Sequence, residues 1–340
     1  MLNGNWRETS RKRRTPTLGS IMNFRPFPGR QRKGQHMSAP APTTSTSAAT
    51  RIVIAGAGPA ARALVRQLDQ GRFAGSITVL SNRDDAPEDL LELALLPQVS
   101  VRFGQPASHI DADNRTVATA DGMEFAYDQL VIATGSAPVA APVEGAAQCL
   151  SYSTIDDAAR IADRVQEVTR ELGRRPLGIL VGTGAAAGQA EAVLRAKGVR
   201  PVRTTARPAA VVPGTSTFGL AASAVVFEDG SSMSGDLVVL AEDRVSCDGL
   251  AASAGLRTAA TGGIVISQDF RTSVPGIWAI GDAAAFDGVR LGLLVAAASA
   301  AGACATQLLT AASAASHSPE ASREAAAAVP SPARSLQAAA

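Results

Sequence analysis

The stretch RIVIAGAGPAARALVRQL, from Arg51 to Leu68, decides the fold. It opens with an apolar run, 52–55, which is short enough to form a buried parallel strand. Two glycines and an alanine follow on a GxGxxA spacing, and apolar residues at helical intervals come next. The pattern therefore predicts a strand, a tight turn and a helix.

Each small residue of this turn has a physical reason. Gly56 permits the tight turn, Gly58 leaves no side chain between backbone and ligand, and Ala61 lets the helix pack close to the strand. The N–H groups at the start of the helix, which begins around Pro59 and Ala60, favour a pyrophosphate. Because the turn lies between a strand and a helix, we interpret it as a dinucleotide-binding loop.

The composition of the 340 residues narrows the function class. The net charge is +2, but the first 36 residues are strongly basic with one acid, Glu8, so the remainder is slightly acidic and a nucleic-acid partner is not indicated. No apolar run reaches the roughly 20 residues of a membrane span. The three cysteines, Cys149, Cys247 and Cys304, lie far apart, which predicts a reducing compartment and no disulfide framework. A cytoplasmic location is expected because the sequence gives no export or membrane signal.

The strand after the first helix, Ser76–Leu80, leads to the position that selects the ribose. A dinucleotide site of this kind uses an acid about 20 residues beyond the glycines. Asn82 stands there instead, with Asp84 and Asp85 just beyond it. Either Asn82 binds the ribose without the charge assistance of a carboxylate, or the contact moves to Asp84.

The stretch LGILVGTGAAAGQAEAVLRAK, Leu177–Lys197, repeats the strand, GxGxxA turn and helix, with Gly182, Gly184 and Ala187 in the turn. Two such units predict two nucleotide-binding domains, since the repeat is far more specific than one loop. Arg203 and Arg207 follow the second unit. They are interpreted either as ligands of a 2′-phosphate, which favours NADP, or as solvated arginines.

Near the end of the chain, a buried strand at 277–280 ends in Gly281 and Asp282, and a helix follows from about Leu293 to Leu309. An aspartate at the end of a buried strand is well placed to bind ligand hydroxyls. The sequence therefore predicts a second ligand contact at this point.

In order along the chain, these motifs resemble the FAD- and NAD(P)-dependent pyridine nucleotide oxidoreductases. The matching pieces are GAGPAA (56–61), YDQLVIATGSAP (127–138), GTGAAA (182–187) and RTSVPGIWAIGDAA (271–284). The ending GDAAAFDGVRLGLLVAAASAAGACATQLL is similar to the flavin module of the assimilatory nitrite reductase large subunit and to rubredoxin-reductase-like proteins. The resemblance spans residues 51–312.

This resemblance implies roles for individual residues. Asn82 meets the adenosine ribose of FAD, the Ala107 backbone faces the adenine, and Asp282 binds the ribityl or pyrophosphate side. The helix after Gly292 points its N-terminus at the flavin pyrimidine. The implied FAD-binding residues are Gly56, Gly58, Pro59, Ala60, Ala61, Asn82, Ala107, Ala133, Thr134, Gly135, Gly281 and Asp282. The residues implied to receive NAD(P)H are Gly182, Gly184 and Ala187.

The chain also departs from the family pattern. The segment 82–98 is short and lacks the arginine loop that lies against the flavin in relatives, which also carry acids where Asn82 and Gln189 stand. Relatives carry a second ATG-like motif at the position after Leu240, where this chain reads Ala241-Glu242-Asp243. Neither a redox dithiol nor the cysteines for an iron–sulfur cluster are present, so disulfide reduction and nitrite reduction by this chain itself are excluded.

The predicted fold is α/β, with two Rossmann-like domains, the second inserted into the first. We expect a disordered basic extension at 1–50, an FAD-binding domain at 51–144 and 265–312, an NAD(P)-binding domain at 145–264 and a disordered Ala/Ser-rich tail at 313–340. The chain starts at Met1 or at Met37.

The first functional hypothesis is an FAD-dependent NAD(P)H oxidoreductase that transfers hydride from nicotinamide to flavin N5 and passes electrons to a separate acceptor. The cofactors carry that chemistry, so no catalytic side chain and no metal site are predicted. The alternative is a non-catalytic FAD- or nucleotide-binding protein of the same fold, and a third interpretation is a reading frame that does not fold. A homodimer is also expected, with no membrane partner.

Overall fold

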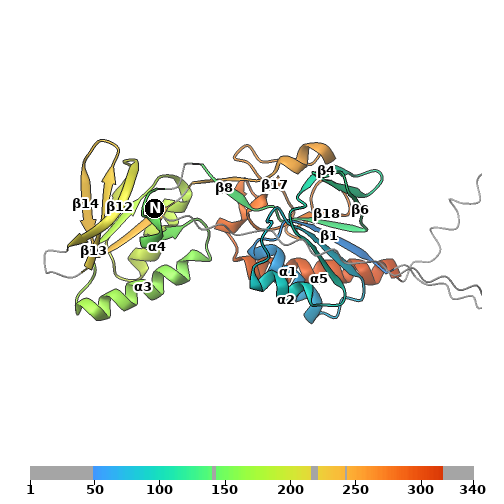
Figure 1. Cartoon of the computed structure of the whole chain (residues 1–340), viewed down its shortest axis with the longest axis horizontal. Coiled ribbons are helices and arrows are strands. Elements are labelled where there is room, and N and C mark those ends of the chain that lie inside the picture. Colours follow the sequence, from blue (N-terminus) through green and yellow to red (C-terminus); the bar gives the residue numbers. More distant parts are fainter. Residues whose placement is uncertain (1–48, 140–142, 216–220, 242, 317–340) are drawn as a thin grey trace, which may run out of the picture. The chain divides into compact units, whose positions relative to one another are not determined.

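The computed structural model describes residues 49–139, 143–215, 221–241 and 243–316 (Figure 1). The segments predicted to be disordered lie almost entirely outside these ranges. One correction concerns the C-terminal segment: residues 313–316 belong to a helix that continues to Ser316, because the alanine-rich sequence keeps its helical propensity past 312.

The first sheet is parallel and five-stranded, in the order β18-β7-β1-β2-β3. It joins segments that are distant in the sequence, because β18 comes from the C-terminal part of the chain. The strands are β1 (Arg51–Ala55), β2 (Ser76–Leu80), β3 (Val99–Arg102), β7 (Gln129–Ile132) and β18 (Ile277–Ala279).

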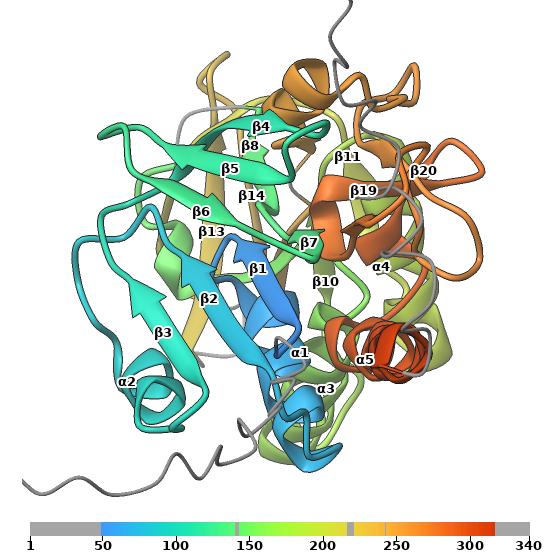
Figure 2. The same ribbon diagram turned by 90° about the vertical axis from the view of Figure 1, so that its right-hand side faces the viewer.

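Successive residues of β1 point into two different cores, as the twofold period of a strand requires. Ile52 and Ile54 pack with three helices, whereas Val53 and Ala55 pack with the opposite layer. Figure 2 shows these helices together on one face of the sheet and β4 to β6 on the other. The helices are α1 (Pro59–Gln70), α2 (Glu88–Ala94) and α5 (Ala297–Ser316); the strands are β4 (Ala107–Asp111), β5 (Thr116–Thr119) and β6 (Glu124–Ala126).

The second sheet is parallel and four-stranded, in the order β11-β10-β15-β9. One face packs against two helices and the other against an antiparallel three-stranded sheet. The strands are β9 (Leu150–Tyr152), β10 (Gly178–Val181), β11 (Val202–Thr204) and β15 (Leu237–Ala241). The covering elements are α3 (Asp157–Leu172), α4 (Gly184–Ala196), β12 (Pro208–Thr215), β13 (Ala221–Phe227) and β14 (Ser232–Gly235).

Short elements complete the structure. The two-stranded ladder is β8 (Ser136–Pro138) with β16 (Arg244–Ser246), and a small sheet contains β17 (Ile264–Val265), β19 (Ala284–Phe286) and β20 (Val289–Arg290). The 3₁₀ turns are η1 (Ala146–Gln148), η2 (Gly249–Ala254), η3 (Gly281–Ala283) and η4 (Leu291–Leu293).

The chain rejoins the core of the first sheet earlier than residue 265. Strand β16 pairs with β8, and Leu250 and Ala254 are buried with Tyr127. The apolar positions of 250–256 were too few to identify this return from the sequence. The predicted α/β architecture with two parallel sheets is confirmed. Among the described residues, no helix is long and apolar enough to cross a membrane.

Candidate functional site

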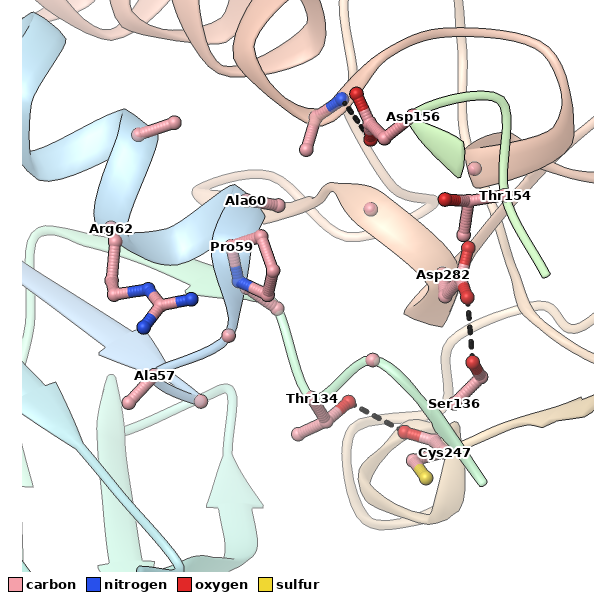
Figure 3. Close-up of a pocket in the computed structure, with 18 of the residues that line it drawn as sticks. Ala57, Pro59, Ala60, Arg62, Thr134, Ser136, Thr154, Asp156, Cys247 and Asp282 are labelled. Atoms are coloured by element: carbon pink, nitrogen blue, oxygen red, sulfur yellow. Dashed lines mark hydrogen bonds between the residues drawn. The ribbon is translucent and has the colours of Figure 1, made fainter. Parts of the chain in front are cut away.

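A cavity of about 1110 Å³ lies at the carboxyl ends of the first sheet's strands. The loop after β1, the segment after β7 and the turn after β18 all contribute to its wall (Figure 3). Ligands of parallel α/β sheets bind in the crevice at this edge. Of the predicted FAD-binding residues, all but Ala61 line this cavity: Gly56, Gly58, Pro59, Ala60, Asn82, Ala107, Ala133, Thr134, Gly135, Gly281 and Asp282.

The first glycine loop presents its backbone to the cavity. Gly56 has a φ of +114°, and a Cβ atom there would lie 2.2 Å from the carbonyl oxygen of Ala133. At Gly58 a Cβ atom would meet no protein atom within 4 Å, and α1 begins at the next residue. Ala61 is buried behind the loop, where it packs in the core. A phosphate-bearing ligand therefore has open access to the N-terminus of α1.

At the end of β2, Asn82 and Arg83 line the cavity, but the two following acids do not. Asp84 points at Gly104, where a Cβ atom would lie 2.6 Å from its Oδ1 atom. Asp85 accepts hydrogen bonds from Arg83 Nε at 2.8 Å and from Nη2 at 2.5 Å. The alternative that the ribose contact moves to Asp84 therefore finds no support in the geometry.

Asp282 lies at the other end of the cavity with one carboxylate oxygen unpaired. Ser136 Oγ donates to its Oδ2 atom at 2.6 Å, and Arg290 Nη1 lies 3.4 Å from the same oxygen. Its Oδ1 atom is buried and accepts no hydrogen bond from the described residues. A Cβ atom on Gly292 would lie 1.8 Å from this oxygen, so only glycine fits there. Because an unpaired buried oxygen is costly, a donor from a ligand, such as a hydroxyl group, would stabilise it.

Two arginines contact Ser136, and one of them, Arg244, also lines the cavity. Arg244 donates from Nε to Ser136 Oγ at 2.8 Å and from Nη2 to the Ser136 carbonyl at 2.6 Å. Arg290 Nη2 donates to the Ser153 carbonyl at 2.6 Å. Burial lowers the pKa of the Arg290 guanidinium and the nearby Arg244 charge acts in the same direction, while Asp282 opposes both. The three side chains hold the Asp282 carboxylate in a fixed orientation.

The N-terminus of α5 also faces the cavity, but a carboxylate of the chain occupies it. The Ala297 N–H donates to Asp156 Oδ2 at 3.0 Å (Figure 3). The resemblance implied that this helix end faces the flavin pyrimidine. In the structure, its first N–H group binds Asp156, which itself lines the cavity.

The second glycine loop has a different environment. Gly182, Gly184 and Ala187 lie between β10 and α4, but none of them lines the cavity described above. Thr183 Oγ1 donates to Asp243 Oδ2 at 2.8 Å, and a Cβ atom on Gly184 would lie 2.9 Å from Asp243 Oδ1. A carboxylate thus stands at the N-terminus of α4, where it disfavours an anionic ligand.

The side chains that follow the second loop are engaged within the protein. Gln189 donates from Nε2 to the Leu293 carbonyl at 2.9 Å and accepts from Tyr152 Oη at 3.1 Å. Arg203 Nη1 lies 3.2 Å from Glu191 Oε2, so one of the two arginines considered for a 2′-phosphate is paired with an acid.

Among the residues that sequence reasoning missed, Ser136, Asp156 and Arg244 line the cavity, and Arg290 contacts Ser136 and Asp282. Ser136 stands inside the YDQLVIATGSAP motif, next to the predicted Gly135, so its position was available as a signal. The others come from segments whose contact with the cavity depends on tertiary packing, and no local pattern marks them.

The two cofactors fit their sites unequally. For FAD, the open space at Gly58 and the unpaired Oδ1 atom of Asp282 fit a dinucleotide with phosphates at one end and hydroxyl groups further along. For NAD(P)H, the loop geometry is present, but the Asp243 carboxylate fits a pyrophosphate poorly.

Comparisons with known proteins agree with a dinucleotide-binding site in this fold. The family model of pyridine nucleotide-disulphide oxidoreductases matches residues 50–187 and 175–315. A nitrite reductase [NAD(P)H] large subunit of Klebsiella oxytoca is 30% identical over 225 residues, which cover 58% of this chain and 23% of that subunit. A probable ferredoxin reductase of Castellaniella defragrans is 29% identical over 274 residues, covering 68% of this chain and 67% of the relative.

This chain thus spans about a quarter of the nitrite reductase subunit. Among solved structures, a covalent putidaredoxin reductase–putidaredoxin complex gives a TM-score of 0.49 at 23% identity, covering 77% of this chain and 76% of that chain. The predicted cofactors, FAD and NAD(P)H, are those of the family, and the predicted resemblance to the nitrite reductase large subunit and to rubredoxin-reductase-like proteins is confirmed. The chain belongs to the pyridine nucleotide-disulphide oxidoreductase family.

Proposed function

We propose that this chain is an FAD-dependent NAD(P)H oxidoreductase that passes electrons to a separate acceptor. The observation that carries the proposal is the cavity at the first glycine loop, which combines the open backbone at Gly58 with the unpaired oxygen of Asp282. When bound, FAD accepts hydride from NAD(P)H and releases electrons singly or in pairs. The protein supplies orientation and an electrostatic environment.

In this proposal the residues of the cavity bind and orient the flavin cofactor. The N-terminus of α1 holds the pyrophosphate, with Gly58 allowing its close approach. Asp282 accepts a hydrogen bond from a ligand hydroxyl at Oδ1, while Ser136 and Arg290 keep the carboxylate in place. No side chain is required to exchange a proton with the substrate.

The domain bounds belong to the same proposal. We assign the FAD-binding domain to 51–139 and 244–316 and the NAD(P)-binding domain to 143–241, following the two sheets and their cores. The acceptor is proposed to be a small redox protein, by analogy with the ferredoxin reductase relative. A cytoplasmic location and a homodimer remain predictions from the sequence.

The test of the flavin site is the variant Gly58→Ala. The backbone there has a φ of −72°, and the added methyl group meets no protein atom within 4 Å, so stability should not change. The methyl group extends into the cavity, so the affinity for FAD should fall at least tenfold, measured by flavin fluorescence. Gly249→Ala is the matched control, since its Cβ atom is equally unhindered and Gly249 does not line the cavity. Unchanged FAD affinity in Gly58→Ala contradicts the proposal.

A second candidate is a nucleotide-binding protein without turnover. The Asp243 carboxylate at the N-terminus of α4 favours it, because hydride delivery requires NAD(P)H at that loop. Anaerobic addition of NADH and then NADPH to the FAD-loaded protein separates the two functions. Bleaching of the flavin absorbance supports the oxidoreductase, and a flavin that stays oxidised with both donors supports the second candidate.

A further inference from the structure

The adenosine end of the cavity carries arginines where a carboxylate would ordinarily bind the ribose. Asn82 and Arg83 line it from the end of β2, and Arg62 lines it from the first turn of α1. Arg62 and Arg83 thus reach the same cavity from two different elements. This end of the cavity is therefore suited to an anion rather than to a pair of free hydroxyl groups.

The nearby acids do not reverse this charge at the cavity wall. Asp85 pairs with Arg83 and Asp89 pairs with Arg62, while Asp84 points at Gly104. None of these three acids lines the cavity. Arg62 and Arg83 thus line the cavity while their acidic partners do not.

The pair between Arg83 and Asp85 is exchangeable. The two side chains are 54% and 63% exposed, and ion pairs this exposed contribute little to stability because water screens them. Arg83 uses Nε and Nη2 for Asp85, which leaves Nη1 outside the pair. A guanidinium binds phosphate oxygens in the same bidentate geometry in which it binds a carboxylate. Arg83 can therefore bind a phosphate through Nη1 while it stays paired with Asp85, or it can replace Asp85 with the phosphate.

We propose that this cavity recognises adenine nucleotides with a phosphate on the adenosine ribose, at the 2′ or the 3′ position, through Arg83 and Arg62. The inference rests on the proposed function, because it takes the nucleotide pyrophosphate to lie at the N-terminus of α1. FAD has no such phosphate. Adenine nucleotides with a 2′- or 3′-phosphate are therefore expected to compete with FAD for this cavity. Their ribose phosphate makes contacts with the arginines that FAD cannot make.

The test is calorimetric titration of the full chain with three ligands that carry two phosphates each: adenosine 2′,5′-bisphosphate, adenosine 3′,5′-bisphosphate and 5′-ADP. Equal phosphate numbers keep the charges of the three ligands within about one unit of each other near pH 7. At least one bisphosphate should bind tenfold or more tightly than 5′-ADP, and the better isomer identifies the position of the phosphate. Binding of 5′-ADP as tightly as both bisphosphates would overturn the inference.

Variants assign the effect to the arginines. Arg83→Ala should reduce the preference to threefold or less, and Asp85→Asn should increase it by freeing Arg83. Arg66→Ala is the control, because Arg66 pairs with Glu92 between α1 and α2, as Arg62 pairs with Asp89, but does not line the cavity. A preference that survives Arg83→Ala, or that disappears in Arg66→Ala, would contradict the assignment.

Flavin fluorescence separates this inference from the proposed function. If the chain binds FAD without preferring a bisphosphate over 5′-ADP, the ribose-phosphate inference fails and the flavin site stands. If it prefers a bisphosphate and does not bind FAD, the inference stands and the flavin proposal fails.

Discussion

Replacing Asp243 with asparagine tests whether the second glycine loop is held closed to NAD(P)H by the chain's own charge. Asparagine has the same shape and can still accept from Thr183 Oγ1, which lies 2.8 Å from Asp243 Oδ2. The substitution removes one negative charge from the N-terminus of α4 and leaves the loop geometry intact. Nucleotide affinity and protein stability should then change in opposite directions.

The size of the effect follows from Coulomb's law. One charge of a pyrophosphate about 6 Å from the carboxylate costs ~0.7 kcal/mol at the dielectric constant of water and ~2.8 kcal/mol at an effective value of 20. A middle value of ~1.4 kcal/mol corresponds to about tenfold in affinity. In the opposite sense, losing a carboxylate at a helix N-terminus costs about 0.3–1 kcal/mol of stability.

The assay is titration with NADH and NADPH by nicotinamide fluorescence at low salt, with thermal unfolding measured in parallel. Asp243→Asn should bind both nucleotides about tenfold more tightly while its Tm falls slightly. The gain in affinity should shrink at high salt, because salt ions screen the repulsion between the Asp243 carboxylate and the pyrophosphate. Asp229→Asn is the control, since Asp229 is an exposed aspartate that accepts from Ser231 in the same half of the chain. An affinity for both nucleotides that is unchanged or weaker in Asp243→Asn would refute this reasoning.

Two further substitutions test the packing around Asp282 and the charge pair between Arg174 and Asp236. Gly292→Ala places a Cβ atom 1.8 Å from the buried Oδ1 atom of Asp282, so it should cost about 2–3 kcal/mol in urea unfolding and weaken FAD binding, and a variant as stable as the parent would contradict that geometry. The Arg174 guanidinium lowers the pKa of the buried Asp236 carboxyl. The resulting stabilisation is present above the unfolded pKa of about 3.9 and is lost as the pH falls through the lower folded value, so Asp236→Asn should flatten the acid limb of stability against pH.

Local features of the fold could be predicted from the sequence. The first strand, its turn and its helix were identified because all three depend on residues adjacent in the chain: an apolar run, glycines where space is needed and apolar residues at helical spacing. Strand β2 was located at Ser76–Leu80 for the same reason. Positions that depend on contacts between distant segments were not identified, such as the return of the chain to the first core before residue 265.

The same limit applies to the site. The motif around Gly135 was recognised, but the pairing of Ser136 with Asp282 and Arg290 requires the ends of three segments to meet. Asp156 accepts a hydrogen bond from the Ala297 N–H at the N-terminus of α5. No sequence pattern near either residue predicts this contact. The spacing of residues within a motif can be recognised in the sequence. The charge partners that tertiary packing brings to that motif from other segments cannot.

The two glycine loops show why equal motifs need not have equal function. Both follow a buried strand and precede a helix, and both read GxGxxA. At the first, the position that a side chain would occupy on Gly58 is open, whereas at the second the corresponding space beside Gly184 holds the Asp243 carboxylate. That carboxylate arrives from the segment after β15, not from the loop itself. Because a phosphate must displace or tolerate this charge, the affinity of the second loop for a phosphate depends on a residue outside the motif.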